Sequence, residues 1–315
     1  MPRNLRSPMK PLMNAIMAVL IFTAALVAQW PPYATPGVPK LADGKPNMDG
    51  PAPHTADGKP DFSGIWMFQG KRSRPPAAPG TIAGSGPGPS TAPAAGAPTT
   101  SAPPPPAPPP AGGVGLGPRP PGISEFFDIG STVEGGLPFT PWAAALRKQR
   151  KDDNNKDNPD AHCLPLGLTQ LHMHPQPRKI IQTPGLIVIL YEAQGGVRQI
   201  FMDGRPLPPS DADPWWYGYS VGHWDGDTLV VETNGFRDDV WLDVEGSPLT
   251  NTGKMTERFR RVNFGHLEIA ITIEDPKSYT RPWTVKFNQR LMVDTDLIEF
   301  ICNENEKSDI HLVGK

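Results

Sequence analysis

Three groups of side chains in this 315-residue sequence are of types that could do chemistry. The first lies in "HCLPLGLTQLHMHP", residues 162–175, where His172 and His174 are two positions apart. On a strand, that spacing places both imidazoles on one face, where they could hold copper or zinc. The prolines of the stretch predict an irregular loop instead, and no His-Glu-x-x-His pattern is present. We therefore expect a loop with no metal and no other cofactor, and His172 and His174 are the alternative metal ligands.

The second group is the aromatic segment "DADPWWYGYSVGHWDGD", residues 211–227. Flat rings that alternate with Asp and Ser suit stacking on sugars or on aromatic ligands, with carboxylates accepting hydroxyl protons. On a strand, however, alternate side chains face opposite sides, so at least half of these rings are expected in the core. The predicted ligand-binding residues are Trp215, Trp216, Tyr217, Tyr219, His223 and Trp224.

The third group consists of charged residues that interrupt apolar strand faces. Charges on an inward face must be paired or must line a cavity. Together they could form a carboxylate–arginine cluster inside a barrel and do acid–base chemistry. The favoured alternative is that they lie at strand ends, or pair with one another as structural ion pairs. The candidate catalytic residues are Glu192, Arg198, Glu257 and Glu299.

Short β-type runs separated by turn residues must position most of these side chains. Nine such runs follow residue 178, the last of them at 297–303, and another lies at 61–68. In "HLEIAITIE", apolar and polar side chains alternate, as in a sheet with one dry and one wet face. "HWDGDTLVV" predicts a tight hairpin, because Asp-Gly suits a two-residue type I′ turn. The fold class is therefore all-β: an antiparallel meander that closes as a lipocalin-like barrel or folds as a sandwich, with one short packing helix.

The packing helix is predicted near 141–151, where Thr140 is the N-cap and Pro141 is the first helical residue. Residues 71–123 are rich in Pro, Ala, Gly and Ser, and this composition predicts a disordered linker. The alternatives are a cell-wall spacer and a ligand for a proline-binding partner. The linker separates an extended segment with a first strand, 29–70, from a β-rich domain, 124–315.

Residues 1–28 have the pattern of a signal peptide, with a basic start followed by an apolar run and small residues. An uncleaved anchor is the alternative, and cleavage would give a periplasmic or secreted protein with no membrane contact. In that compartment the two cysteines, Cys163 and Cys302, are expected to form a disulfide. The net charge of −2 gives no basic footprint for nucleic acid.

Several motifs together resemble a family of uncharacterised exported bacterial proteins. They include "DGKPDFSGIW", "GDTLVVETNGF" and "EFICNENEK", and the resemblance covers about 55–70 and most of 137–307. The family has no established activity, so the resemblance implies export but no reaction. The His-Met-His of 172–174 is not part of its pattern.

Three functions remain open from the sequence. The leading one is an exported protein that binds a small molecule, such as a glycan or an aromatic or lipidic molecule, through the rings of 215–224. The second is a secreted hydrolase or lyase that uses a Glu/Asp pair with Arg or His. The third is a structural protein of the cell envelope with a proline-rich spacer.

Overall fold

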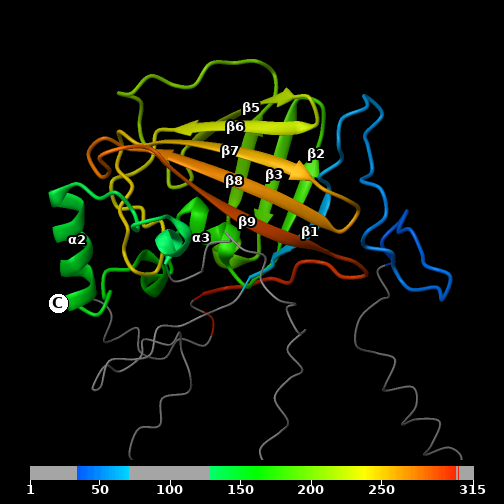
Figure 1. The fold of residues 1–315 in the computed structure, drawn as a ribbon, viewed down its shortest axis with the longest axis horizontal. Helices are drawn as coiled ribbons and strands as arrows, with labels where there is room; N and C mark the ends of the chain where they lie inside the picture. Colours follow the sequence, from blue (N-terminus) through cyan, green and yellow to red (C-terminus); the bar gives the residue numbers. More distant parts are fainter. Residues whose placement is uncertain (1–33, 71–127, 303, 305–315) are drawn as a thin grey trace, which may run out of the picture. The chain divides into compact units, whose positions relative to one another are not determined.

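The computed structural model describes residues 34–70, 128–302 and 304, and their strands form a closed barrel (Figure 1). Neighbouring strands follow one another in chain order, and the last strand pairs with the first. Every pair is antiparallel except β4–β5, which is parallel. The prediction of an all-β meander is confirmed, as a barrel and not as a sandwich. The strands are β1 (Gly64–Phe68), β2 (Arg178–Gln182), β3 (Leu186–Tyr191), β4 (Val197–Phe201), β5 (Tyr219–Asp225), β6 (Thr228–Asn234), β7 (Lys254–Arg261), β8 (His266–Glu274) and β9 (Trp283–Met292).

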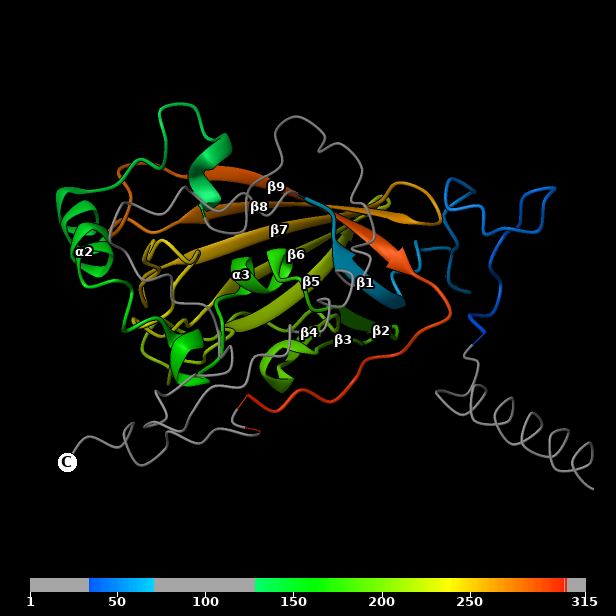
Figure 2. The same cartoon turned by 90° about the horizontal axis from the view of Figure 1, so that it is seen from below.

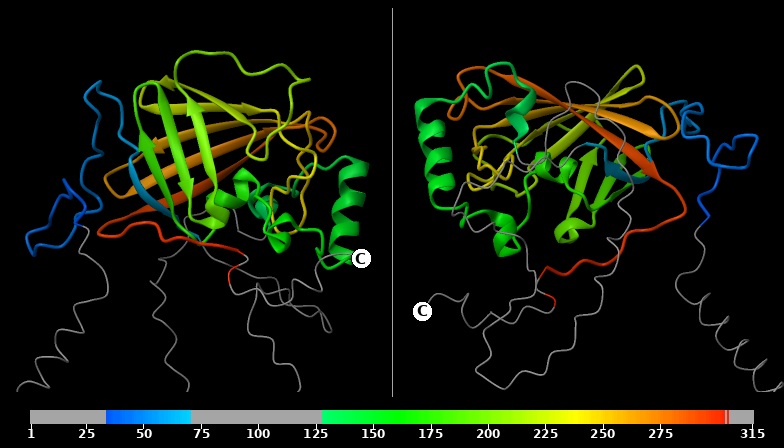
Figure 3. Two further views of the ribbon diagram at one scale, coloured as in Figure 1. Left: turned by 180° about the vertical axis from the view of Figure 1, so that it is seen from behind. Right: turned by 60° about the horizontal axis from the view of Figure 1, so that its bottom comes forward.

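Alternating side chains create the barrel, as β8 illustrates. Its Leu267, Ile269, Ile271 and Ile273 are all buried on the inner face, whereas the residues between them are at least partly exposed. The predicted β5–β6 hairpin also forms, and its two loop residues are 226 and 227. A glycine is needed at the first of them because its φ is +59°. Figure 3 shows the ring of strands from two further sides.

Side chains fill the barrel interior. Trp66 on β1 is fully buried, and the Arg261 guanidinium lies over its ring, 5.0 Å from the ring centre. Phe287 and Ile271 on the inner face are also fully buried. Barrels of about eight strands are either filled by side chains or hold one small ligand, so the buried side chains and not the strand number describe this interior.

Two α-helices lie outside the sheet pattern. The predicted helix forms as α2 (Pro141–Asp152), and the Thr140 hydroxyl accepts a hydrogen bond from the Ala143 N–H at 3.3 Å. It buries only Ala143. The helix that packs most closely is the shorter α3 (Leu168–Met173), in which every residue is buried and which lies within the ring of strands (Figure 2). Short 3-10 turns occur at η1 (Ile129–Thr132), η2 (Pro159–His162) and η3 (Ala193–Gly195).

Two segments differ from the sequence predictions. The stretch 162–175 is not simply an irregular loop, because it contains η2 and α3. The run 297–303 is not a strand over its described residues, since β9 already pairs with β1 and the closed barrel leaves no edge for another strand. The Ile298 N–H instead donates a hydrogen bond to a Glu192 carboxylate oxygen at 3.1 Å.

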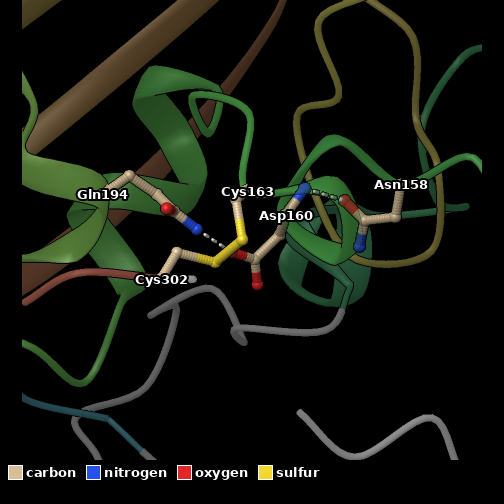
Figure 4. Close-up of a disulfide and its surroundings, with 5 residues drawn as sticks. All are labelled: Asn158, Asp160, Cys163, Gln194 and Cys302. Carbon is tan, nitrogen blue, oxygen red and sulfur yellow. Dashed lines mark hydrogen bonds between the residues drawn. A yellow bond between two sulfur atoms is a disulfide. The ribbon is translucent and has the colours of Figure 1, made fainter. Parts of the chain in front are cut away.

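The predicted disulfide between Cys163 and Cys302 is present (Figure 4). Cys302 lies beyond β9 rather than in a last strand, and Cys163 directly follows η2. Beside the bond, the Gln194 side-chain amide donates to an Asp160 carboxylate oxygen at 2.7 Å. The disulfide therefore ties the segment after β9 to the segment that leads into α3.

A small separate unit contains residues 34–37 and 293–296 among those described. Within it, the Thr35 N–H donates to the Asp294 carboxylate, and the Asp294 N–H donates to the Thr35 hydroxyl. The predicted signal peptide, 1–28, and the predicted linker, 71–123, lie outside the described residues. Across the described ranges, no helix combines the length and the apolar character that a membrane span requires.

Candidate functional site

One cluster of charged side chains lies inside the barrel. It joins Arg198 on β4, Glu257 on β7 and His172 on α3. The Arg198 Nη1 donates to Glu257 Oε1 at 3.1 Å, and its Nη2 contacts the other carboxylate oxygen. The His172 Nε2 lies 2.7 Å from the same Oε1. Each of the three residues is at most 2% exposed, so this is a fully buried ion pair with a histidine attached.

Two hydroxyl groups complete the hydrogen bonding of Arg198. Ser220 on β5 and Thr233 on β6 face each other across the strand pair, and their hydroxyls are 2.9 Å apart. The Arg198 guanidinium donates to Ser220 Oγ at 3.1 and 3.0 Å, and to Thr233 Oγ1 at 3.0 Å. A buried charge is tolerated when it is both paired and hydrogen-bonded, and Arg198 meets both conditions.

The cluster fixes the protonation of its members. Burial alone raises the pKa of Glu257, but the Arg198 charge and the His172 hydrogen bond outweigh burial and lower that pKa to about 2. Burial lowers the pKa of His172, which outweighs the opposing effect of Glu257. The histidine is therefore neutral at pH 7, and its Nε2–H donates to the ionised carboxylate.

Arg178 on β2 holds the end of α3 in place. Its Nη1 donates to the His172 carbonyl at 2.9 Å, and its Nη2 approaches the His174 carbonyl at 3.4 Å. Cations are favourable at the C-terminus of a helix, where carbonyl groups lack partners within the helix. Burial lowers the pKa of Arg178 to about 10, so it remains charged at pH 7.

The interpretation of His172 as an incidental loop residue was wrong. It is a buried helical residue that hydrogen-bonds Glu257. The spacing of Leu168 and Leu171, three apart, is the one signal in the sequence that points to a helix there. Among the described residues, no group of three or more His, Cys, Asp or Glu side chains could hold a metal ion.

The candidate catalytic residues are only partly brought together. Arg198 and Glu257 meet in the buried cluster, with His172 added. Glu192 follows β3 and accepts a hydrogen bond from the Ile298 N–H, while Glu299 is exposed and outside any strand. The buried carboxylate is held ionised in an ion pair, so the arrangement is that of a structural interaction, one of the alternatives that the sequence allows.

The aromatic segment divides between the two faces of the barrel wall. On β5, Tyr219 and His223 face outward and Trp224 faces inward, where it stacks on Phe62 at 5.7 Å between ring centres. Tyr217 is half-buried and lies 6.2 Å from the Tyr191 ring. Trp216 is covered by the Arg237 guanidinium, 4.5 Å from its ring.

Two of the predicted rings meet on the outer surface with a third that the sequence analysis did not include. Tyr219 stacks on Phe201 of β4 at 5.1 Å, and Trp215 lies 5.5 Å from Tyr219. We call Phe201, Trp215 and Tyr219 the aromatic platform. Trp215 is 40% exposed, which leaves a large part of its indole open to solvent. Phe201 could have been found only by knowing that β4 and β5 are neighbours in the barrel.

Backbone contacts fix the position of Trp215. Its N–H donates to the Gly235 carbonyl at 2.8 Å, and its own carbonyl accepts from the Arg237 N–H at 3.2 Å. Gly235 has a φ of +68°, and a Cβ atom there would lie 3.0 Å from two indole carbons. Glycine at this position therefore allows the indole to lie against the backbone.

Arg205 and Asp203 add polar groups beside the rings. The Arg205 guanidinium lies 3.9 Å above the Phe201 ring centre, and its Nη1 donates to the Tyr219 hydroxyl at 3.0 Å. Asp203 accepts from Arg205 Nε at 2.9 Å and from Nη2 at 2.6 Å. The platform thus combines an open indole with fixed donors and acceptors.

Comparison of the chain with protein-family models, curated proteins and solved structures finds no match.

Proposed function

We propose that this chain is an exported protein, periplasmic or secreted, that binds a carbohydrate on the aromatic platform. The observation that carries the proposal is Trp215, which is 40% exposed, whose backbone is hydrogen-bonded to Gly235 and Arg237, and whose indole lies next to Tyr219. A sugar ring presents a face of C–H groups that packs on an aromatic ring, and its hydroxyls need donors and acceptors at the edge. Asp203 and Arg205 provide both.

The rigidity of the platform favours binding. A side chain that is already ordered loses little conformational entropy when a ligand arrives, so more of the contact energy appears as affinity. Trp215 is ordered by the contacts of its own backbone and by Gly235 beneath its ring. We place the ligand on the outer surface, because a ligand inside the barrel would have to displace fully buried side chains such as Trp66.

Export is supported by two independent features. The N-terminal residues 1–28 have the composition of a signal peptide, and the described cysteines form a disulfide. Disulfides persist mainly in oxidising compartments.

The experiment is a retention assay of the purified protein on insoluble polysaccharides of different backbone chemistry, comparing wild type with Trp215→Ala. We expect wild type to be retained on at least one polysaccharide. We expect Trp215→Ala to bind the same polysaccharide at least about tenfold more weakly, because the aromatic stacking partner is lost. Trp142→Ala is the matched control, because Trp142 on α2 is 44% exposed but lies outside the platform. Equal retention of wild type and Trp215→Ala, or no retention of wild type, would overturn the proposal.

A further inference from the structure

The buried cluster around His172 contains more positive than negative charge. Arg178 and Arg198 are both fully buried, and among the described residues Glu257 is the one carboxylate that contacts either of them. Three other carboxylates are buried in the described ranges but exert no effect on the two arginines: Glu192, Asp243 and Asp275. Because His172 is neutral, one positive charge is left in excess inside the barrel.

Arg178 carries this excess charge. Glu257 neutralises Arg198, whereas the hydrogen bonds of Arg178 go to backbone carbonyls at the end of α3. Burial lowers the pKa of Arg178, and the one described group that opposes this shift is Tyr191, not a carboxylate. The C-terminus of a helix supplies at most about half of a negative charge, so α3 cannot balance a full guanidinium charge. A buried charge without a counterion is costly.

Two buried donors lie at this position and lack an acceptor. Tyr191 on β3 is the direct cross-strand partner of Arg178 on β2, and both side chains are buried. Among the described residues, the Tyr191 hydroxyl and the Arg178 Nε have no hydrogen-bond acceptor. Burial raises the pKa of Tyr191, so its hydroxyl keeps its proton and cannot itself be the counterion. Buried donors are nearly always hydrogen-bonded, so these two require an acceptor.

A small anion meets both requirements at once. It supplies the negative charge and accepts hydrogen bonds from the Tyr191 hydroxyl and the Arg178 Nε, whereas water supplies an acceptor without a charge. The interior is filled by side chains such as Trp66, so only an ion close in size to a water molecule is compatible with it. We infer that one monovalent anion of the size of chloride binds inside the barrel between Tyr191 and Arg178. This site is separate from the aromatic platform, and the inference does not depend on the proposed function.

The bound anion would couple the halide concentration to the stability of the barrel. Arg178 holds the end of α3 against β2, and Tyr191 belongs to the neighbouring strand β3. An anion between them neutralises the cation that fixes this helix. Because the two donors come together only in the folded chain, the anion binds the folded state and stabilises it by mass action.

The experiment is urea-induced unfolding of the full chain at pH 7 with the disulfide intact, in mixtures of chloride and methanesulfonate salts. Chloride is raised from about 0.01 M to about 1 M at constant ionic strength, so that screening of surface charges stays the same. Methanesulfonate has several heavy atoms and is too large for the site. We expect the folding equilibrium constant of wild type to rise about tenfold for each tenfold rise in chloride above the dissociation constant.

Tyr191→Phe separates anion binding from an ordinary buried hydroxyl. If the hydroxyl binds the anion, the variant should lose the chloride dependence and fold at least about tenfold less favourably than wild type in about 1 M chloride. If no anion binds, removal of a hydroxyl that lacks a partner should leave the stability unchanged or raise it. Tyr279→Phe is the matched control, because the Tyr279 hydroxyl is also buried but donates to the Pro248 carbonyl at 2.8 Å. It should be less stable at every chloride concentration and keep the wild-type dependence.

Bromide locates the site directly, because it resembles chloride in charge and size and scatters X-rays anomalously. Crystals of the full chain grown in bromide should show an anomalous peak in contact with the Tyr191 hydroxyl and the Arg178 Nε. Three results would each overturn the inference: a wild-type stability that does not depend on chloride, the same dependence in Tyr191→Phe as in wild type, or bromide bound only elsewhere.

Discussion

Removing the negative charge of Glu257 tests whether the interior cluster is a dry ion pair. Glu257→Gln keeps the size of the side chain but leaves the Arg198 guanidinium without its counterion. Arg198 is 2% exposed, so water cannot replace the lost carboxylate. Breaking a buried pair by removing one partner costs about 3–5 kcal/mol, because an uncompensated charge stays behind. We expect a loss of that size in the free energy of unfolding.

A second pair on the same strand provides the control. Arg260 on β7 donates to Glu268 on β8 at 3.1 and 2.7 Å on the outer face, where their side chains are 58% and 46% exposed. Exposed pairs contribute between about 0 and 1 kcal/mol, so Glu268→Gln should change the unfolding free energy by less than about 1 kcal/mol. Because both variants replace a glutamate that is paired with an arginine, the comparison separates the effect of burial from the effect of the substitution itself.

The assay is urea-induced unfolding at pH 7 with the disulfide intact, followed by fluorescence and circular dichroism. Coincident transitions and unchanged m-values are required before the midpoints are converted to free energies. If Glu257→Gln and Glu268→Gln lost the same stability, the interior would have to be hydrated, and the cluster would not be the buried ion pair described above.

The same pair predicts the response to acid. The pKa of Glu257 is lowered in the folded state to about 2 from an ordinary value of 4.5. Its ionised form therefore stabilises the fold above about pH 4.5, and this contribution is lost as the pH falls toward 2. By linkage the loss is about 3 kcal/mol. Glu257→Gln should lack this acid-dependent loss.

Two further predictions concern groups outside the barrel interior. Burial raises the pKa of Asp243 to about 6, so its contribution to stability is present below about pH 3.8 and is lost as the pH rises through 6. Between pH 3.8 and 6, the unfolding free energy of wild type, measured in urea titrations, should fall by about 3 kcal/mol, and that of Asp243→Asn should not. An equal dependence on pH in both proteins would refute the raised pKa of Asp243. Cys163→Ser and Cys302→Ser should each cost about 4–5 kcal/mol, because the disulfide closes a separation of 139 residues. Reduced wild type should unfold at the same urea midpoint as the two variants. If the two variants differed in stability, the cysteines would contribute more than the disulfide bond alone.

Strand positions were the most predictable part of the fold. The runs at 178–182 and 266–274 coincide with β2 and β8, because an alternation of inner and outer side chains leaves a period of two in the sequence. The disulfide was predicted because the sequence has only two cysteines and its first 28 residues have the pattern of a signal peptide. The strand positions followed from a local pattern in the sequence, and the disulfide followed from the number of cysteines.

The environment of His172 could not be predicted in this way. α3 has six residues, too few for a helical period to be recognised, and its polar residues Thr169, Gln170 and His172 are buried like its apolar ones, so polarity does not mark a solvent-exposed face. The partner of His172 is 85 residues further along the chain. The run 297–303 was wrongly predicted as a strand for a different reason: its isoleucines and Phe300 are residue types common in strands, but the β1–β9 pairing already closes the barrel.

The aromatic platform depends on the least predictable pairing in the barrel. β4 and β5 are parallel and share only two residue pairs, which bring Phe201 beside Val221 and Ile200 beside Ser220. On the inner side of this short junction, Arg198 of β4 donates twice to Ser220 of β5. On the outer side, Phe201 of β4 stacks on Tyr219 of β5.

The inner face of the β4–β5 junction therefore contributes to stability, and its outer face carries residues of the proposed binding site. On the inner face, Glu257 neutralises the Arg198 guanidinium, which would be costly to bury alone. The side chain of Arg198 links β4 to β5 where their backbone pairing is shortest. Outside, the same two strands present Phe201 and Tyr219 at a fixed separation of 5.1 Å. Because successive side chains on a strand point to opposite faces, the residue that anchors β5, Ser220, is the immediate neighbour of the ring that β5 contributes to the platform.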